Sequence, residues 1–243
     1  MTDGIGLAAH LRVEELRYRA RTVRPGLDAM AIDPAISLDE YLRLQLHLPT
    51  FGPAGRAFQV LADTVPGIRD TVVIGKVIYE ANREEWDIVI ADGPPIGQMI
   101  SYLRAPATIE SLVPSGRVER QASWMRRLLE DPGHTALVMA TLAEELPVTE
   151  TLEALDDLDR EHLVDVAEVV VNRLLPDLDV TAGQLVDAPA GPARDAATLH
   201  CGLRRSQQAW LERLPPATLL PHLFGVFTPG EVAARLADLW EEA

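Results

Sequence analysis

Three short stretches of this chain are almost entirely apolar, and they constrain the fold more than any other feature. They read WDIVIA (Trp86–Ala91), ALVMATL (Ala136–Leu142) and VAEVVV (Val166–Val171). Strands buried on both faces of a parallel sheet have this composition. Two weaker runs, Leu27–Ile32 and Thr218–Phe224, predict two further strands.

Helical patterns lie between these strands. Ser37–Glu40 and Thr228–Glu231 each have the form of a capping box, in which a hydroxyl and a carboxylate satisfy the first amides of a helix. An apolar stripe on an acidic helix after Pro147 consists of Leu152, Leu155 and Leu158. Alternating strands and helices predict a doubly wound α/β fold, with a mainly parallel sheet and helices on both faces.

The chain reads as one domain over residues 1–243. A short helical excursion is expected at about residues 97–134, and its apolar stripe, expected to be core, consists of Val118, Ala122, Met125 and Leu129. The stretch Pro176–Arg194 is rich in Pro, Gly, Asp and Ala, so we interpret it as a loop within that domain.

Composition excludes several classes of protein. The formal net charge of −15 argues against a general nucleic-acid binder, which needs a basic surface for phosphates. Cys201 is the only cysteine, and no pair of histidines has metal-ligand spacing, so we expect no disulfide framework and no zinc. We find neither a signal sequence nor a long apolar span, and therefore expect a cytoplasmic protein.

The sequence contains no phosphate-binding P-loop. That motif, G-x-x-x-x-G-K-[ST], needs a lysine, and Lys76 is the only lysine in the 243 residues. Around it the sequence reads DTVVIGKV, so Asp70 stands where the first glycine would be and Val77 where the hydroxyl residue would be.

An acidic loop, Asp92-Gly93-Pro94-Pro95-Ile96-Gly97, directly follows the stretch WDIVIA. An aspartate after a buried parallel strand lies at the sheet edge where open α/β folds bind ligands. In nucleotide hydrolases such an aspartate holds Mg²⁺, directly or through water. The alternative is a tight strand-to-helix turn with no further role.

Asn172 and Arg173 end the stretch VAEVVV in the same way. An asparagine side chain both donates and accepts hydrogen bonds, as contact with the edge of a base requires. Asparagine is also a common turn residue, and the sequence around it leaves both interpretations open.

Four motifs in this order and spacing resemble the ATPase family of arsenical pumps and tail-anchored-protein targeting factors. They are WDIVIADGPPIG, ALVMATLAEELPVTETLEAL, VVVNRLLPD and LPHLFG. The segments PGLDAMAIDPAISLDEYL and IGKV are similar to shorter actinobacterial-type members described as anion-transporting ATPases. The resemblance extends over nearly the whole chain.

The resemblance implies roles for particular residues. Asp92 would act on Mg²⁺ through water and on the attacking water, within a mobile switch loop formed by Gly93, Pro94, Pro95 and Gly97. Asn172, followed by Arg173, would contact adenine, and the base would be walled by Pro221, His222, Leu223 and Phe224. The implied cofactors are ATP and Mg²⁺, and the implied assembly is a homodimer or a pair with a related ATPase subunit.

Departures from the family pattern bear on activity. The family begins with a strand and a P-loop that this sequence lacks, and Ile96 stands where the family loop has threonine. The lone Cys201 matches neither the C-x-x-C zinc site of the targeting members nor the cysteine cluster of the arsenical pumps. We therefore expect an incomplete N-terminus and no ATP hydrolysis by this chain alone.

Two other interpretations remain. The chain is also compatible with a non-catalytic regulatory or scaffolding subunit that pairs with a P-loop-bearing paralogue. A plain α/β domain with coincidental motifs is the third alternative. No segment of the chain indicates a membrane partner.

Overall fold

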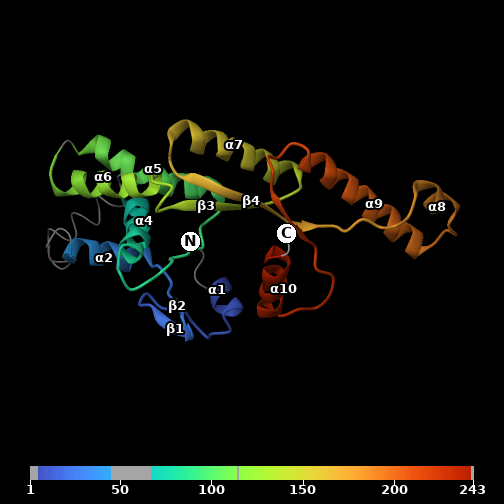
Figure 1. Ribbon diagram of the computed structural model, residues 1–243, viewed down its shortest axis with the longest axis horizontal. Helices are drawn as coiled ribbons and strands as arrows, with labels where there is room; N and C mark the ends of the chain where they lie inside the picture. Colours follow the sequence, from blue (N-terminus) through green and yellow to red (C-terminus); the bar gives the residue numbers. More distant parts are fainter. Residues whose placement is uncertain (1–4, 45–66, 114, 242–243) are drawn as a thin grey trace. The chain divides into compact units, whose positions relative to one another are not determined.

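Residues 5–44, 67–113 and 115–241 are described by the computed structural model of the chain (Figure 1). The chain divides into two units. The first comprises residues 1–136 and 158–165, and the second comprises residues 137–157 and 166–243. Within the described residues, no helix is both long and apolar enough to cross a membrane.

The second unit is built on a three-stranded parallel sheet with the order β3 (Ala136–Leu142), β4 (Asp165–Leu174) and β5 (Thr218–Pro221). Residues Val170 and Val171 of β4 lie opposite Thr218 and Leu219 of β5. The sheet is flanked by helices, as the alternating pattern predicts. The predicted strands at 136–142 and 166–171 are confirmed, and the expected α/β fold with them.

The run predicted as a strand over Thr218–Phe224 is a strand only as far as Pro221. The register between β4 and β5 shifts between Val171 and Leu174, so the regular ladder is already disturbed at this end. One further bond follows, from the His222 amide to the Leu174 carbonyl at 2.7 Å. Phe224 then lies outside the strand and is 60% exposed.

Helix α7 (Glu145–Glu161) begins before Pro147, and of the predicted leucine stripe only Leu158 is fully buried. Its buried residues are Val148, Thr151, Ala154 and Leu158, whereas Leu152 and Leu155 are only half-buried. The Thr151 hydroxyl can be buried because it donates to the Pro147 carbonyl at 2.7 Å and is hydrogen-bonded to the Thr141 hydroxyl on β3 at 2.9 Å.

Three helices follow β4: α8 (Ala182–Asp187), α9 (Pro192–Leu211) and α10 (Pro229–Glu241). The start predicted for α10 is confirmed, since the Thr228 amide donates to the Glu231 carboxylate at 2.8 Å. The stretch interpreted as a loop contains the short helix α8, whose capping box is formed by Thr181 and Gln184.

The first unit holds a group of packed helices: α2 (Pro34–Leu44), α4 (Ile68–Ala81), α5 (Ile96–Leu112) and α6 (Arg117–Glu130). Helix α5 packs against α6 and α4, and α4 packs against α2 (Figure 1). On α6 the side chains of Ala122, Met125 and Leu129 are buried, so the stripe predicted for this excursion is core. A shorter helix, α1 (Ile5–His10), precedes this group in the chain.

The predicted strand Leu27–Ile32 is wrong in length and in environment. Residues Leu27–Ala29 form β2, which pairs antiparallel with β1 (Arg21–Arg24), and Leu27 is 40% exposed. The turn between them contains Pro25 and Gly26, with φ 75° at the glycine. This turn closes a local hairpin, so the segment finds its partner next to it in the chain.

The predicted strand Trp86–Ala91 is also wrong, because these residues form no regular structure. Ile88 is 80% exposed and Ile90 is 90% exposed. A strand needs a neighbour for its amides and carbonyls, and among the described residues the only sheets are β1–β2 and β3–β4–β5. The apolar composition predicted a buried strand at Trp86–Ala91, but no strand of the described residues pairs with this stretch.

The capping box predicted at Ser37 is wrong as well. Helix α2 begins three residues earlier, at Pro34, and Asp33 accepts a hydrogen bond from the Ile36 amide at 2.9 Å. An aspartate before a proline is a stronger start signal, because proline fits the first helical position and the carboxylate caps the first turn. Ser37 is instead buried within the helix.

Candidate functional site

The predicted switch residues lie together on the loop that leads into α5. Asp92, Gly93 and Pro95 are exposed and Pro94 is half-buried. The Pro95 carbonyl accepts the amides of Gln98 at 2.9 Å and Met99 at 3.0 Å, which fixes the start of the helix. Gly97, in the first turn, is exposed.

This loop offers no preformed metal site. Across residues 5–44, 67–113 and 115–241, no three His, Cys, Asp or Glu side chains gather as a metal ion would require. Mg²⁺ usually binds through one or two carboxylates together with waters and substrate phosphates. Asp92 can supply one such carboxylate, so the loop fits Mg²⁺ only together with a bound phosphate.

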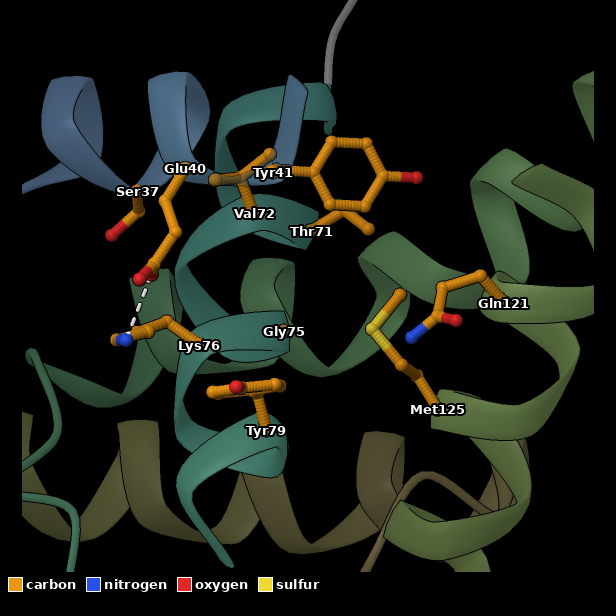
Figure 2. A pocket seen from close by; sticks show the side chains of 10 residues that line it. All are labelled: Ser37, Glu40, Tyr41, Thr71, Val72, Gly75, Lys76, Tyr79, Gln121 and Met125. Carbon is orange, nitrogen blue, oxygen red and sulfur yellow. Dashed lines mark hydrogen bonds and ion pairs between the residues drawn. The ribbon is translucent and has the colours of Figure 1, made fainter. Parts of the chain in front are cut away.

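A buried ion cluster lies elsewhere in the first unit, around Lys76 on α4 (Figure 2). Its ammonium lies 2.8 Å from Glu40 Oε2 on α2 and 2.8 Å from Glu80 Oε1 one turn further along α4. The Tyr18 hydroxyl also donates to Glu40 Oε2, at 2.6 Å. The Lys76 ammonium stands over the rings of Tyr18, at 4.8 Å, and Tyr79, at 5.2 Å.

Three groups of this cluster, Glu40, Lys76 and Tyr18, have shifted pKa values. Burial disfavours the charge on Glu40, but hydrogen bonds from Lys76 and Tyr18 outweigh it and lower the pKa of Glu40. Burial disfavours the charge on Lys76 too, yet hydrogen bonds to Glu40 and Glu80 raise its pKa. Burial and the hydrogen bond to Glu40 raise the pKa of Tyr18 to about 12. Lys76 is therefore a structural cation and not a phosphate ligand.

A small cavity of about 50 Å³ adjoins this cluster, as Figure 2 shows. Its lining residues come from α2, α4 and α6: Ser37, Glu40, Tyr41, Thr71, Val72, Gly75, Lys76, Tyr79, Gln121 and Met125. A cavity of this size holds a few water molecules, whereas sites for small organic ligands measure about 300–1,000 Å³. We therefore exclude this cavity as a nucleotide site.

In the second unit, the structure brings the predicted base-contacting residues to neighbouring strand ends. Asn172 and Arg173 lie near the end of β4, and Leu174 is in register with Pro221 at the end of β5. Asn172 Oδ1 accepts the Arg173 amide at 2.8 Å, and Arg173 has φ 59°. The amide group of Asn172 is thus oriented by its own backbone while its side chain stays partly accessible.

Gln207 on α9 fixes this strand end, a contact that the sequence analysis missed. Its Nε2 donates to the Arg173 carbonyl at 3.2 Å, and its Oε1 accepts the Leu175 amide at 2.9 Å. Gln207 lies 32 residues from Leu175 in the chain. No local pattern could therefore have identified it.

An aromatic group lies beside this strand end. The ring of Phe224 meets His222 edge-on at 4.6 Å and stacks near His200 of α9 at 6.3 Å. Leu223, which stands between His222 and Phe224 in the sequence, is half-buried. The sequence analysis considered the histidines only as metal ligands. An exposed aromatic ring is a suitable surface for stacking a planar base.

The predicted site residues therefore form two groups. Asn172, Arg173, Pro221, Leu223 and Phe224 gather in the second unit, and the Asp92 loop belongs to the first.

The sequence matches the profile of a family described as anion-transporting ATPase, over residues 12–124 and 114–188. The ATPase BagA of Mycobacterium tuberculosis is 31% identical in an alignment of 212 residues that covers 82% of this chain and 61% of the relative. The ATPase get3 of Schizosaccharomyces pombe is 25% identical in an alignment of 195 residues that covers 66% of this chain and 59% of the relative. The chain thus spans about three fifths of the length of these relatives.

Proposed function

The chain belongs to the anion-transporting ATPase family, and from this premise we propose that it carries the base-binding part of a nucleotide site. In this proposal Asn172 contacts the edge of adenine, and Phe224 stacks on its face. Pro221, Leu223 and Arg173 form the surrounding wall. The Asp92 loop is the switch that responds to the phosphates.

The observation that carries this proposal is the pairing at the ends of β4 and β5. Leu174 and Pro221 are in register, and the His222 amide continues the contact to Leu174. Asn172 precedes this pair on β4, and Phe224 follows it after β5, so both belong to neighbouring segments at the carboxyl edge of a parallel sheet. Open α/β folds bind their ligands at that edge.

ATP hydrolysis is not expected from the 243 residues alone. Mg²⁺ would neutralise charge on the phosphates, with Asp92 holding it through water. The sequence contains no lysine-bearing phosphate loop. Its one lysine, Lys76, forms ion pairs with Glu40 and Glu80. We therefore propose nucleotide binding through the base, and hydrolysis only where another segment supplies the phosphate contacts.

Adenosine titration of the 243-residue chain tests this proposal. Stacking of a base on an aromatic side chain contributes about 1–3 kcal/mol, so Phe224→Ala should weaken binding by about 5- to 150-fold. Asn172→Ala should weaken it by about tenfold through loss of the base-edge hydrogen bonds. Phe227→Ala is the matched control, since its ring contacts Arg235 and the backbone beside Gly225. Equal affinity of all four proteins, or no adenosine binding at all, would overturn the proposal.

A second role is favoured by the exposed stretch Trp86–Ala91. Ile88 and Ile90 are almost fully exposed, and they would be covered if a related subunit supplied a neighbouring strand. In that case the chain is a regulatory subunit paired with a P-loop-bearing paralogue in the cytoplasm, or it forms a homodimer. The solution mass of the wild-type chain and of the Ile88→Asp variant distinguishes a homodimer from a chain that is monomeric without the paralogue.

A further inference from the structure

A second hollow, of about 420 Å³, lies in the second unit between the loop after β4 and helix α9. It is lined by Asp177, Leu178, Val180, His200, Cys201, Arg204, Arg205 and Gln208. This volume is within the range of small-molecule sites. Apart from His200, which contacts Phe224, its lining is separate from the proposed base wall.

The lining is cationic in a protein whose net charge is −15. Gln208 lies four residues after Arg204 and three after Arg205 on α9, and all three residues line the hollow. Arg205 is exposed and forms no ion pair with any other described residue. An unneutralised guanidinium at the edge of a hollow attracts anions, and its planar fork matches a carboxylate or a phosphate.

Arg204 is already oriented for such a ligand. Its Nη1 donates to Gln208 Oε1 at 3.3 Å, and its Nη2 donates to Asp177 Oδ2 at 3.4 Å. Its Nε lies 3.0 Å from Asp177 Oδ1 but is buried without a hydrogen bond within the described part of the chain. The side chain of Arg204 is 20% exposed, whereas that of Asp177 is 80% exposed. The guanidinium is thus fixed, and its carboxylate partner is poorly aligned and in contact with solvent.

The remaining lining defines the shape of the ligand. His200 Nε2 lies 2.7 Å from the Pro176 carbonyl, which only accepts, so Nε2 carries a proton and holds the loop against α9. Leu178 and Val180 add an apolar wall on the loop side. The hollow therefore combines two guanidinium groups with an apolar surface.

We infer that this hollow binds a small organic anion, with its phosphate or carboxylate on Arg204 and Arg205 and its apolar part against Leu178 and Val180. The ligand displaces the Asp177 carboxylate from Arg204. Asp177 is 80% exposed, so its carboxylate can be solvated after the exchange. The site is independent of the base-binding proposal, because neither Asn172 nor Phe224 lines it.

Calorimetric titration with phenyl phosphate, inorganic phosphate and benzoate tests the inference on the 243-residue chain. Phenyl phosphate should bind at least about fivefold more tightly than inorganic phosphate, because only it reaches the apolar wall. Benzoate binding as tightly as phenyl phosphate assigns a carboxylate, and weaker binding assigns a phosphate. Equal affinity for inorganic and phenyl phosphate, or no binding of any of the three probes, would overturn the inference.

Two variants and a control locate the bound anion. Arg205→Ala should weaken phenyl phosphate binding by about tenfold, through loss of a charged hydrogen bond. Asp177→Asn should tighten it severalfold by removing the competing carboxylate, a gain that misfolding cannot imitate. Arg213→Ala is the control, since Arg213 stacks on Trp210 outside the hollow. Unchanged affinity in both Arg205→Ala and Asp177→Asn would show that any bound anion lies elsewhere.

Discussion

The buried cluster around Lys76 and the strand-end group around Asn172 and Phe224 differ in how far their side chains are already occupied by other residues. In the cluster, the Lys76 side chain is 7% exposed and its charge is met by two carboxylates and two aromatic rings. At the strand end, Phe224 is 60% exposed and its ring lies at the surface. The side chains of the Lys76 cluster are therefore not available to a ligand, whereas those of the strand-end group are.

This difference separates stability from binding within one chain. A buried charge that loses its partner is costly, so the cluster should tolerate little change. An exposed ring contributes little to folding, so the strand end can be altered without loss of the fold. The variants below test that contrast, beginning with the largest expected effect.

Replacing Lys76 by methionine should have the largest effect. Glu40 would then lose its ion-pair partner and Glu80 would keep only the more exposed Arg83, and breaking a buried pair costs about 3–5 kcal/mol in the free energy of unfolding. Urea denaturation measures this loss. The matched control is Arg83→Met, which removes an exposed partner of Glu80 and should leave the unfolding midpoint nearly unchanged. Similar midpoints for Lys76→Met and the wild type would contradict the burial of the cluster.

Chemical labelling provides a second test of the cluster. Lys76 is the only lysine, it is buried, and its pKa is raised, so an amine-reactive ester should not modify it in the native chain. In urea the same reagent should modify it fully. Peptide mass spectrometry identifies the modified residue, and rapid native labelling at Lys76 would show that the cluster is open.

The pH dependence of stability should reflect Glu40. Its pKa in the folded chain is below the ordinary value of 4.5, so its contribution is present above pH 4.5. That contribution is lost as the pH falls through the folded-state pKa. Glu40→Gln should therefore be less stable than the wild type at pH 7, and its urea midpoint should fall less between pH 5 and pH 3. Glu153→Gln, on the exposed side of α7, should keep the wild-type slope.

Replacing Phe224 by alanine should have the smallest effect on stability, below about 1 kcal/mol, because the ring is largely exposed. The same substitution should abolish most adenosine binding. A large drop in the unfolding midpoint would show that Phe224 belongs to the core of its unit, and the contrast between the two regions would then fail.

The parts of the fold that the sequence predicted well depend on local signals or on strong burial. The cap at Thr228 is local, and β3 and β4 are nearly continuous in apolar residues. Trp86–Ala91 has the same composition but forms no strand, because pairing requires a neighbour that composition does not report. The buried face of α7 includes Thr151 because its hydroxyl is hydrogen-bonded to that of Thr141 on β3.

The sites were predictable to different extents. The motif ending β4 drew attention to Asn172, and the motif after β5 drew attention to Phe224. The Lys76 cluster was missed because Glu40 lies 36 residues away and joins Lys76 only when α2 packs against α4. The one available signal was the i,i+4 spacing of Lys76 and Glu80. Gln207 and Arg204 act through contacts across the fold, which no single segment could indicate.

Phosphate release from Mg·ATP tests the central claim most directly, namely that this chain binds the base but does not itself hold the phosphates for hydrolysis. The assay compares the 243-residue chain with its Asp92→Asn variant at equal concentration. We expect both to release phosphate at the rate of the buffer. Turnover by the wild-type chain that is lost in Asp92→Asn would contradict the account, because it would show that these residues already form a working phosphate site.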